Sequence, residues 1–73
     1  MVHIGNLIRK VLREKKISVV EFAAMADVNS RTMYRILRRE SIDSAELNRY
    51  AHLLDHDFFR DLSDAIHLEQ EGR

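Results

Sequence analysis

The chain has no cysteine, no proline and no tryptophan, and only two of its 73 residues are glycine. Without cysteine it can form neither disulfides nor thiolate-bound zinc or iron–sulfur sites. The scarcity of proline and glycine favours helices over a turn-rich β fold. No apolar run approaches the roughly 20 residues that span a bilayer, and the amino terminus lacks the pattern of a signal peptide. We therefore expect an all-α cytoplasmic protein that does not enter a membrane.

The charges balance overall but are divided unevenly along the chain. Residues 1–39 hold nine Lys or Arg and three acidic residues, a net charge of +6, whereas residues 40–73 hold three Arg and nine acidic residues, a net charge of −6. This asymmetry indicates a face that binds a polyanion, although a solvated surface with arbitrary charge placement explains the charges alone equally well. The length fits a single domain, with a core at about residues 3–62 and a helical or frayed extension at 63–73.

Apolar spacing predicts a first amphipathic helix from about His3 to Lys16. Its stripe repeats at i, i+3, i+4, i+7 and i+8, and consists of Ile4, Leu7, Ile8, Val11 and Leu12. Lys15 and Lys16 lie near its end, where cations complement the helix dipole.

A second and a third helix are predicted on either side of a tight turn. Ser18 and Glu21 have the spacing of a capping box, so the second helix should begin there. Asp27 occupies the turn, where a left-handed backbone is often required, and Asn29 is a preferred cap for a third helix from Ser30 to about Arg39. The third helix turns Met33, Ile36 and Leu37 inward, and its outer side carries Ser30, Arg31, Tyr34, Arg35 and Arg38. That outer side is polar and basic, and most of its side chains are long.

Two further helices complete the predicted fold. Asp43 or Ser41 can cap the fourth, whose apolar residues are Leu47, Tyr50, Ala51 and Leu54. A fifth begins near Asp57 with the stripe Phe58, Phe59, Leu62 and Ile66. We expect Phe58 or Phe59 to close the core, because two aromatic side chains are costly to leave in water. Ile66 and Leu68 exceed what the core needs, which favours a dimer or tail-packing surface.

The segment from Ile4 to Leu62 resembles the phage repressor, Cro and Xre-type helix-turn-helix family, a compact five-helix, lambda-repressor-like DNA-binding domain. The resemblance is carried by IGNLIRKVLREKKIS, by the E-F-A-x-x-A of the second helix, by V-N-S-R-T-M-Y-R-I and by the closing LNRYAHLLDHDFF. In that family the inward residues equivalent to Ala23, Val28 and Ile36 fix the angle between the second and third helices.

The resemblance also implies which residues contact DNA. The base-reading positions correspond to Ser30, Arg31, Tyr34 and Arg35, and an arginine fork can donate two hydrogen bonds to a guanine. The expected phosphate contacts, which position the protein without reading sequence, are Lys15, Lys16, Ser18, Asn29, Arg38 and Arg39. The family commonly has glutamine where this chain has Val19, and glycine where it has Asp27.

The expected function is that of a sequence-specific DNA-binding transcriptional regulator, which binds double-stranded DNA as a homodimer at a pseudo-palindromic site. The alternative is a protein-interaction module on the same fold, antitoxin-like or anti-regulator, that uses a face formed by Val19, Val20 and Met25. We expect no enzyme activity, no cofactor and no small-molecule substrate.

Two other groups of residues have the composition of chemical sites. His52 and His56 have a spacing that could bind a metal on one helix face, but the helix is predicted to end between them and no further ligand completes a set. Ser63, Asp64 and His67 include the residue types of a hydrolase triad, yet they crowd one terminal helix without an oxyanion site. We therefore expect no metal site and no catalytic residue.

Overall fold

The computed structural model describes residues 2–71, and within them the chain forms five α-helices and no strand. The helices are α1 (Ile4–Lys15), α2 (Val19–Met25), α3 (Ser30–Ile36), α4 (Ser44–Leu54) and α5 (Phe58–Glu71). The all-α prediction and the five predicted helices are therefore confirmed.

Polar side chains accept hydrogen bonds from backbone amides in the first turn of all five helices, including His3 at α1 and Asp57 at α5. The Ser18 hydroxyl accepts a hydrogen bond from the Glu21 amide at 3.0 Å, and the Glu21 carboxylate accepts one from the Ser18 amide at 3.3 Å. Asn29 accepts from a backbone amide in the first turn of α3 at 2.8 Å, and Asp43 does the same for α4 at 2.8 Å. The predicted capping box and the caps at Asn29 and Asp43 are confirmed.

Three junctions between helices contain a non-glycine residue with positive φ. Lys16 ends α1 at φ 58°, Asp27 follows α2 at φ 55°, and Asp55 ends α4 at φ 49°. The left-handed turn predicted at Asp27 is therefore confirmed. The predicted limits of the first helix, His3 and Lys16, are the caps that flank α1.

α3 is shorter than predicted: it ends at Ile36, whereas the sequence predicted an end near Arg39. The backbone amides of Ile4 and Gly5, in the first turn of α1, donate to the carbonyl oxygens of Glu40 at 2.8 Å and of Arg39 at 3.0 Å. These carbonyls satisfy amides that have no partner within α1. The tertiary contact draws the chain out of the helical path, so the predicted extension of the third helix to Arg39 is wrong.

Gly5 permits this contact because it has no side chain. A Cβ added at Gly5 would overlap the carbonyl group of Leu37 and would lie 2.8 Å from the carbonyl oxygen of Arg39. The backbone of α1 therefore approaches the end of α3 more closely than any other residue type at this position allows.

All five helices contribute to one buried core. Phe22 and Tyr50 meet edge to face, with ring centroids 5.1 Å apart and an interplanar angle of 70°. Of the two phenylalanines considered for closing the core, Phe58 is fully buried and Phe59 is 41% exposed. The core comprises Ile4, Ile8, Val11, Leu12, Phe22, Ala23, Ala26, Met33, Leu37, Leu47, Tyr50, Leu54 and Phe58.

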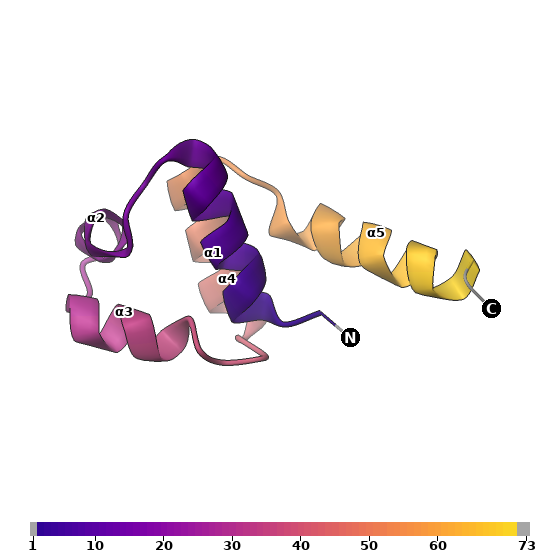
Figure 1. Cartoon of the computed structure of the whole chain (residues 1–73), viewed down its shortest axis with the longest axis horizontal. Helices are drawn as coiled ribbons and strands as arrows, with labels where there is room; N and C mark the ends of the chain where they lie inside the picture. Colours follow the sequence, from indigo (N-terminus) through magenta and orange to yellow (C-terminus); the bar gives the residue numbers. More distant parts are fainter. Residues whose placement is uncertain (1, 72–73) are drawn as a thin grey trace.

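α5 extends away from the other four helices (Figure 1), and the molecule measures 41 × 21 × 21 Å along its principal axes. Its first turn enters the core through Phe58, whereas Ile66 and Leu68 near its outer end are 56% and 69% exposed. The two residues predicted to exceed the needs of the core therefore lie in solvent.

Gly5→Ala should destabilise the protein by at least about 2 kcal/mol, because the added methyl group would force α1 away from residues 37–39. Helix propensity alone predicts the opposite sign, since alanine stabilises a helix interior by about 1 kcal/mol relative to glycine. Urea unfolding measures the difference. Asn6→Ala, at the exposed neighbouring position, is the control and should change stability by less than about 0.5 kcal/mol. Equal stability of Gly5→Ala and wild type would contradict the close contact.

Stability should decrease in alkaline solution because of Tyr50. Burial, and then the neighbouring Glu46 carboxylate, raises the pKa of Tyr50 from 10.0 to about 12. The unfolded chain releases this proton first, so the stabilisation is complete below pH 10 and is lost as the pH rises towards 12. Tyr50→Phe should flatten the decrease in urea midpoint over this range, whereas Tyr34→Phe, which removes an exposed hydroxyl, should not. A slope unchanged in Tyr50→Phe would show that other groups cause the decrease.

Candidate nucleic-acid interface

The α2–α3 pair is held in one arrangement by its buried side. Phe22 and Ala23 of α2, Ala26 at its C-cap and Met33 of α3 are all at most 1% exposed. In the intervening turn the Val28 amide donates to the Ala23 carbonyl at 2.9 Å, and the Val28 side chain packs against the core. The predicted inward positions of Ala23 and Val28 are confirmed. The packing of this buried side fixes the orientation of α3, and with it the direction in which the outer side of α3 faces.

The four predicted base-reading residues lie within the first six residues of α3. Arg31, Tyr34 and Arg35 are exposed, and Ser30 is half-buried. Met33, on the opposite side of the same helix, is fully buried. The structure therefore brings two guanidinium-bearing side chains and a phenol together on one exposed helix surface.

The predicted phosphate contacts fall into four places, the last of which is the carboxyl end of α1. Arg38 and Arg39 are exposed but lie in the turn after α3 and not on the helix. Asn29 is exposed, and its side-chain oxygen is engaged as the cap of α3. Ser18 is exposed at the start of α2, where its hydroxyl oxygen already accepts the Glu21 amide.

Lys15 and Lys16 are exposed at the carboxyl end of α1. The amino end of the same helix, at Ile4 and Gly5, is the end that contacts the segment following α3. At 1.5 Å per residue the two ends are about 16 Å apart along the helix axis. The structure therefore does not gather these two lysines at the carboxyl end of α3.

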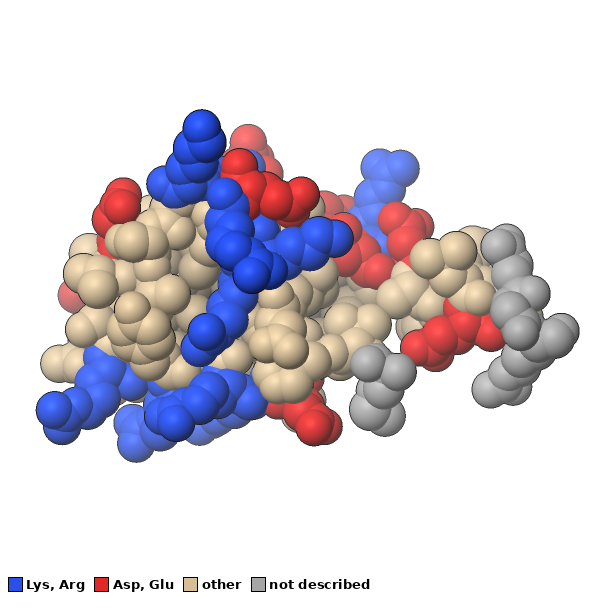
Figure 2. Space-filling model, in the orientation of Figure 1, with Lys and Arg blue, Asp and Glu red and all other residues tan. Residues whose placement is uncertain are grey.

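The basic side chains are grouped on the surface. Figure 2 shows Lys and Arg side chains in two bands, one over α1 and one along the edge where α3 lies, with acidic side chains along α5 and others beside both bands. A polyanion that approached the face shown in Figure 2 would meet the basic bands over α1 and along α3.

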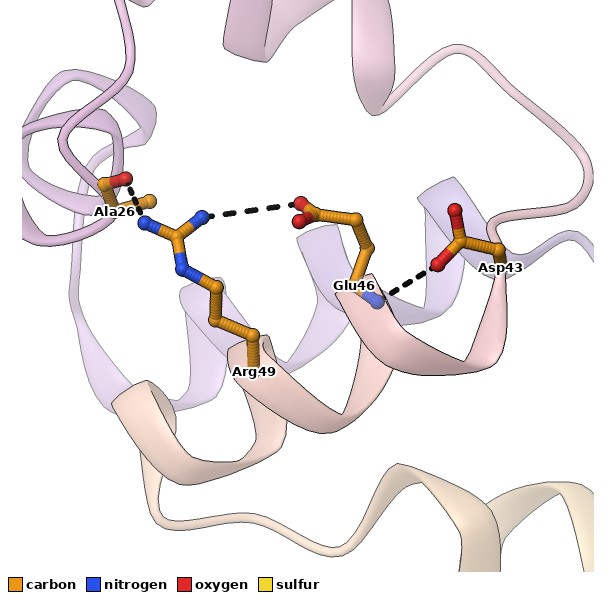
Figure 3. Close-up of polar contacts among 4 residues, drawn as sticks. All are labelled: Ala26, Asp43, Glu46 and Arg49. Carbon is orange, nitrogen blue, oxygen red and sulfur yellow. Dashed lines mark hydrogen bonds and ion pairs between the residues drawn. The ribbon is translucent and has the colours of Figure 1, made fainter.

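Arg49 ties the end of α2 to α4 (Figure 3). Its Nη2 donates to the carbonyl oxygen of Ala26, the residue that ends α2, and its Nη1 lies 3.8 Å from a carboxylate oxygen of Glu46. Asp43 caps the same helix one turn earlier. No local sequence signal points to this link, because Arg49 and Ala26 are 23 residues apart. Arg49 thus fixes the turn that carries α3.

The structure also contains a basic cleft beside α1 that the sequence analysis did not predict. Arg9 and Arg13 line it together with Leu12, Ile17, Ser18 and Val19, and its volume is about 250 Å³. The Nε atom of Arg9 is buried and makes no hydrogen bond within residues 2–71. The available signal was the four-residue spacing of Gly5, Arg9 and Arg13, which places them on one side of α1.

His52 lies within α4, whereas His56 lies after the end of that helix. α4 ends at Leu54, between His52 and His56, as predicted. His56 instead pairs with Asp61, with 2.6 Å between Nε2 and Oδ2, and its ring meets Phe58 at a centroid distance of 4.8 Å. Within the described residues no group of three or more His, Asp or Glu side chains could hold a metal ion. The side chains of Ser63, Asp64 and His67 are exposed along α5.

None of the helices described between residues 2 and 71 is long and apolar enough to cross a membrane. No protein-family model, curated protein or solved structure matches the chain.

Arg49→Met should loosen the turn before α3, because methionine keeps an apolar stem but cannot donate to the Ala26 carbonyl. We expect a loss of about 1 to 2 kcal/mol in stability, together with faster hydrogen exchange of the Val28 amide. Arg60→Met removes an exposed arginine from α5 and is the matched control. If the two variants exchange the Val28 amide equally fast, the Arg49 link does not hold the turn.

Proposed function

We propose that the protein is a DNA-binding transcriptional regulator of the phage repressor, Cro and Xre type, with α2 and α3 as its helix-turn-helix. The observation that carries the proposal is the two-sided character of α3, where Arg31, Tyr34 and Arg35 are exposed opposite the fully buried Met33. A short helix held from behind and basic in front is suited to entering the major groove.

The electrostatics of α3 support the same function. Arg31 and Arg35 are four residues apart on one helix, where like charges repel by a few tenths of a kcal/mol. A polyanion removes this repulsion. In the proposed complex these two arginines read base edges, with Ser30 and Tyr34 beside them, and Arg38 and Arg39 contact phosphates.

The proposed assembly on DNA is a homodimer, with one chain in each half-site. A single module of this size buries only about 600 to 1,000 Å² against DNA, so two half-sites are needed for high affinity. α5 exposes three large apolar side chains, those of Phe59, Ile66 and Leu68. Because such side chains are disfavoured in water, we propose that a second copy of the chain covers this helix.

Replacement of Arg31 or Arg35 by alanine should weaken sequence-specific binding by roughly tenfold or more, because each change removes a fork that can bond a guanine. The target sequence is first selected from a random DNA pool, and binding is then measured by titration at several salt concentrations. Arg60→Ala removes the same charge from α5 and should bind as wild type does. Sedimentation of the complex should give two chains per duplex.

Two outcomes would contradict the proposal. Unchanged affinity in both Arg31→Ala and Arg35→Ala would show that α3 is not the reading helix. An affinity that stays flat between low and moderate salt would exclude contacts dominated by phosphates.

A protein-interaction module is the second candidate, and the exposure of α2 favours it. Val20 is 58% exposed and Met25 is 42% exposed, whereas Val19 packs partly against the core. Apolar side chains on the solvent side of a helix are typical of protein contacts. Capture of a stable protein partner, together with no DNA binding at low salt, would favour this function.

A further inference from the structure

We propose that the cleft between α1 and the start of α2 binds a phosphate group of the DNA backbone through the guanidinium groups of Arg9 and Arg13. The DNA part of this proposal rests on the proposed function. Neither arginine belongs to the contacts that the sequence resemblance implies. The cleft would add an anchoring contact on a helix separate from α3.

The burial of one atom of Arg9, its Nε, is the first observation behind this assignment. Its Nε is shielded from solvent and finds no acceptor among the described residues. An arginine keeps its charge at any physiological pH, so it cannot escape this cost by losing a proton. A buried donor without a partner is destabilising, and an anion bound in the cleft would supply an acceptor once the Arg9 side chain rotates towards it.

The lining of the cleft gives the second observation. Two of its six lining residues are arginines and none is acidic. The Glu21 carboxylate accepts a hydrogen bond from the Ser18 amide and does not line the cleft. The apolar side chains of Leu12, Ile17 and Val19 lower the local dielectric, which strengthens the attraction between a guanidinium group and an anion.

The position of the cleft gives the third observation. Gly5, Arg9 and Arg13 follow one another at four-residue intervals and so lie on one side of α1. At one end of this row Gly5 contacts the segment that follows α3, and at the other Arg13 lies beside the start of α2. The row therefore runs from the segment after α3 to the start of α2, and in the proposed complex the backbone of the bound duplex follows it.

Arg9→Gln and Arg13→Gln should each lower DNA affinity by roughly tenfold at low salt, the equivalent of one charged hydrogen bond. The slope of log affinity against log salt should decrease by about 0.9, the value for one lost phosphate contact. Lys10→Gln is the matched control, since Lys10 lies on the same helix but lines a different groove, together with Glu14, Asp61 and Asp64. It should change the slope by much less.

Thermal melting first establishes that the variants fold. If Arg9→Gln does not fold, Arg9→Lys keeps the charge and most of the stem but removes the Nε–H, and it should still bind DNA less tightly than wild type. A decrease as large in Lys10→Gln as in the cleft variants, or no decrease in Arg9→Gln and Arg13→Gln, would overturn the site.

Titration of the free protein with inorganic phosphate separates the two proposals. The NMR resonance of Arg9 Nε–H should shift on addition of phosphate, and the shift should be lost in Arg13→Gln. If the wild type binds no DNA yet shows this shift, the proposed function fails and the cleft is a site for free phosphate. If the resonance does not move and the cleft variants bind DNA normally, the cleft proposal fails while the proposed function stands.

Discussion

The backbone contact between the first turn of α1 and the segment after α3 determines how the rest of the molecule is arranged. Two amides of α1 are satisfied by the carbonyls of Arg39 and Glu40, at 3.0 and 2.8 Å, across a contact that only glycine at position 5 permits. The same contact ends α3. The length of the exposed basic helix is thus fixed by residues more than 30 positions earlier in the sequence.

The two sides of the α2–α3 pair differ in character: one is apolar and buried, and the other is basic and exposed. The buried apolar side of the α2–α3 pair and the link from Arg49 to Ala26 hold the pair in place, while its front, the outer side, carries exposed arginines. A polyanion that binds this front finds a surface already in place, because the supporting side chains pack without it. The acidic residues of α5 lie outside this region, so they do not neutralise it.

Sequence reasoning was most accurate for features that depend on neighbours within about four residues. The capping box at Ser18, the cap at Asn29 and the left-handed Asp27 are all of this kind. The end of α3 was wrongly predicted because it depends on Gly5, which belongs to another helix. For the same reason no local pattern distinguished buried Phe58 from exposed Phe59.

The candidate site follows the same rule. Once Met33 is taken as the inward residue, helical periodicity places Arg31, Tyr34 and Arg35 outside, and the structure agrees. The positions of Lys15 and Lys16 could not be derived in this way, because their distance from α3 depends on the direction in which α1 crosses the molecule. The cleft that Arg9 lines depends on the closeness of α1 to the start of α2, which periodicity does not report.

In the proposed homodimer, the anchoring of α5 would link association to folding. The helix is fixed at one end, by buried Phe58 and by the pair of His56 and Asp61, while its other end carries apolar side chains into water. A partner that covers the outer end only when the helix is docked adds its binding free energy to that of folding. In a chain of 73 residues with a small core, that increment is a large fraction of the total. The melting temperature of such a protein would then rise with its own concentration, as it does for any assembly whose subunits are stabilised by each other.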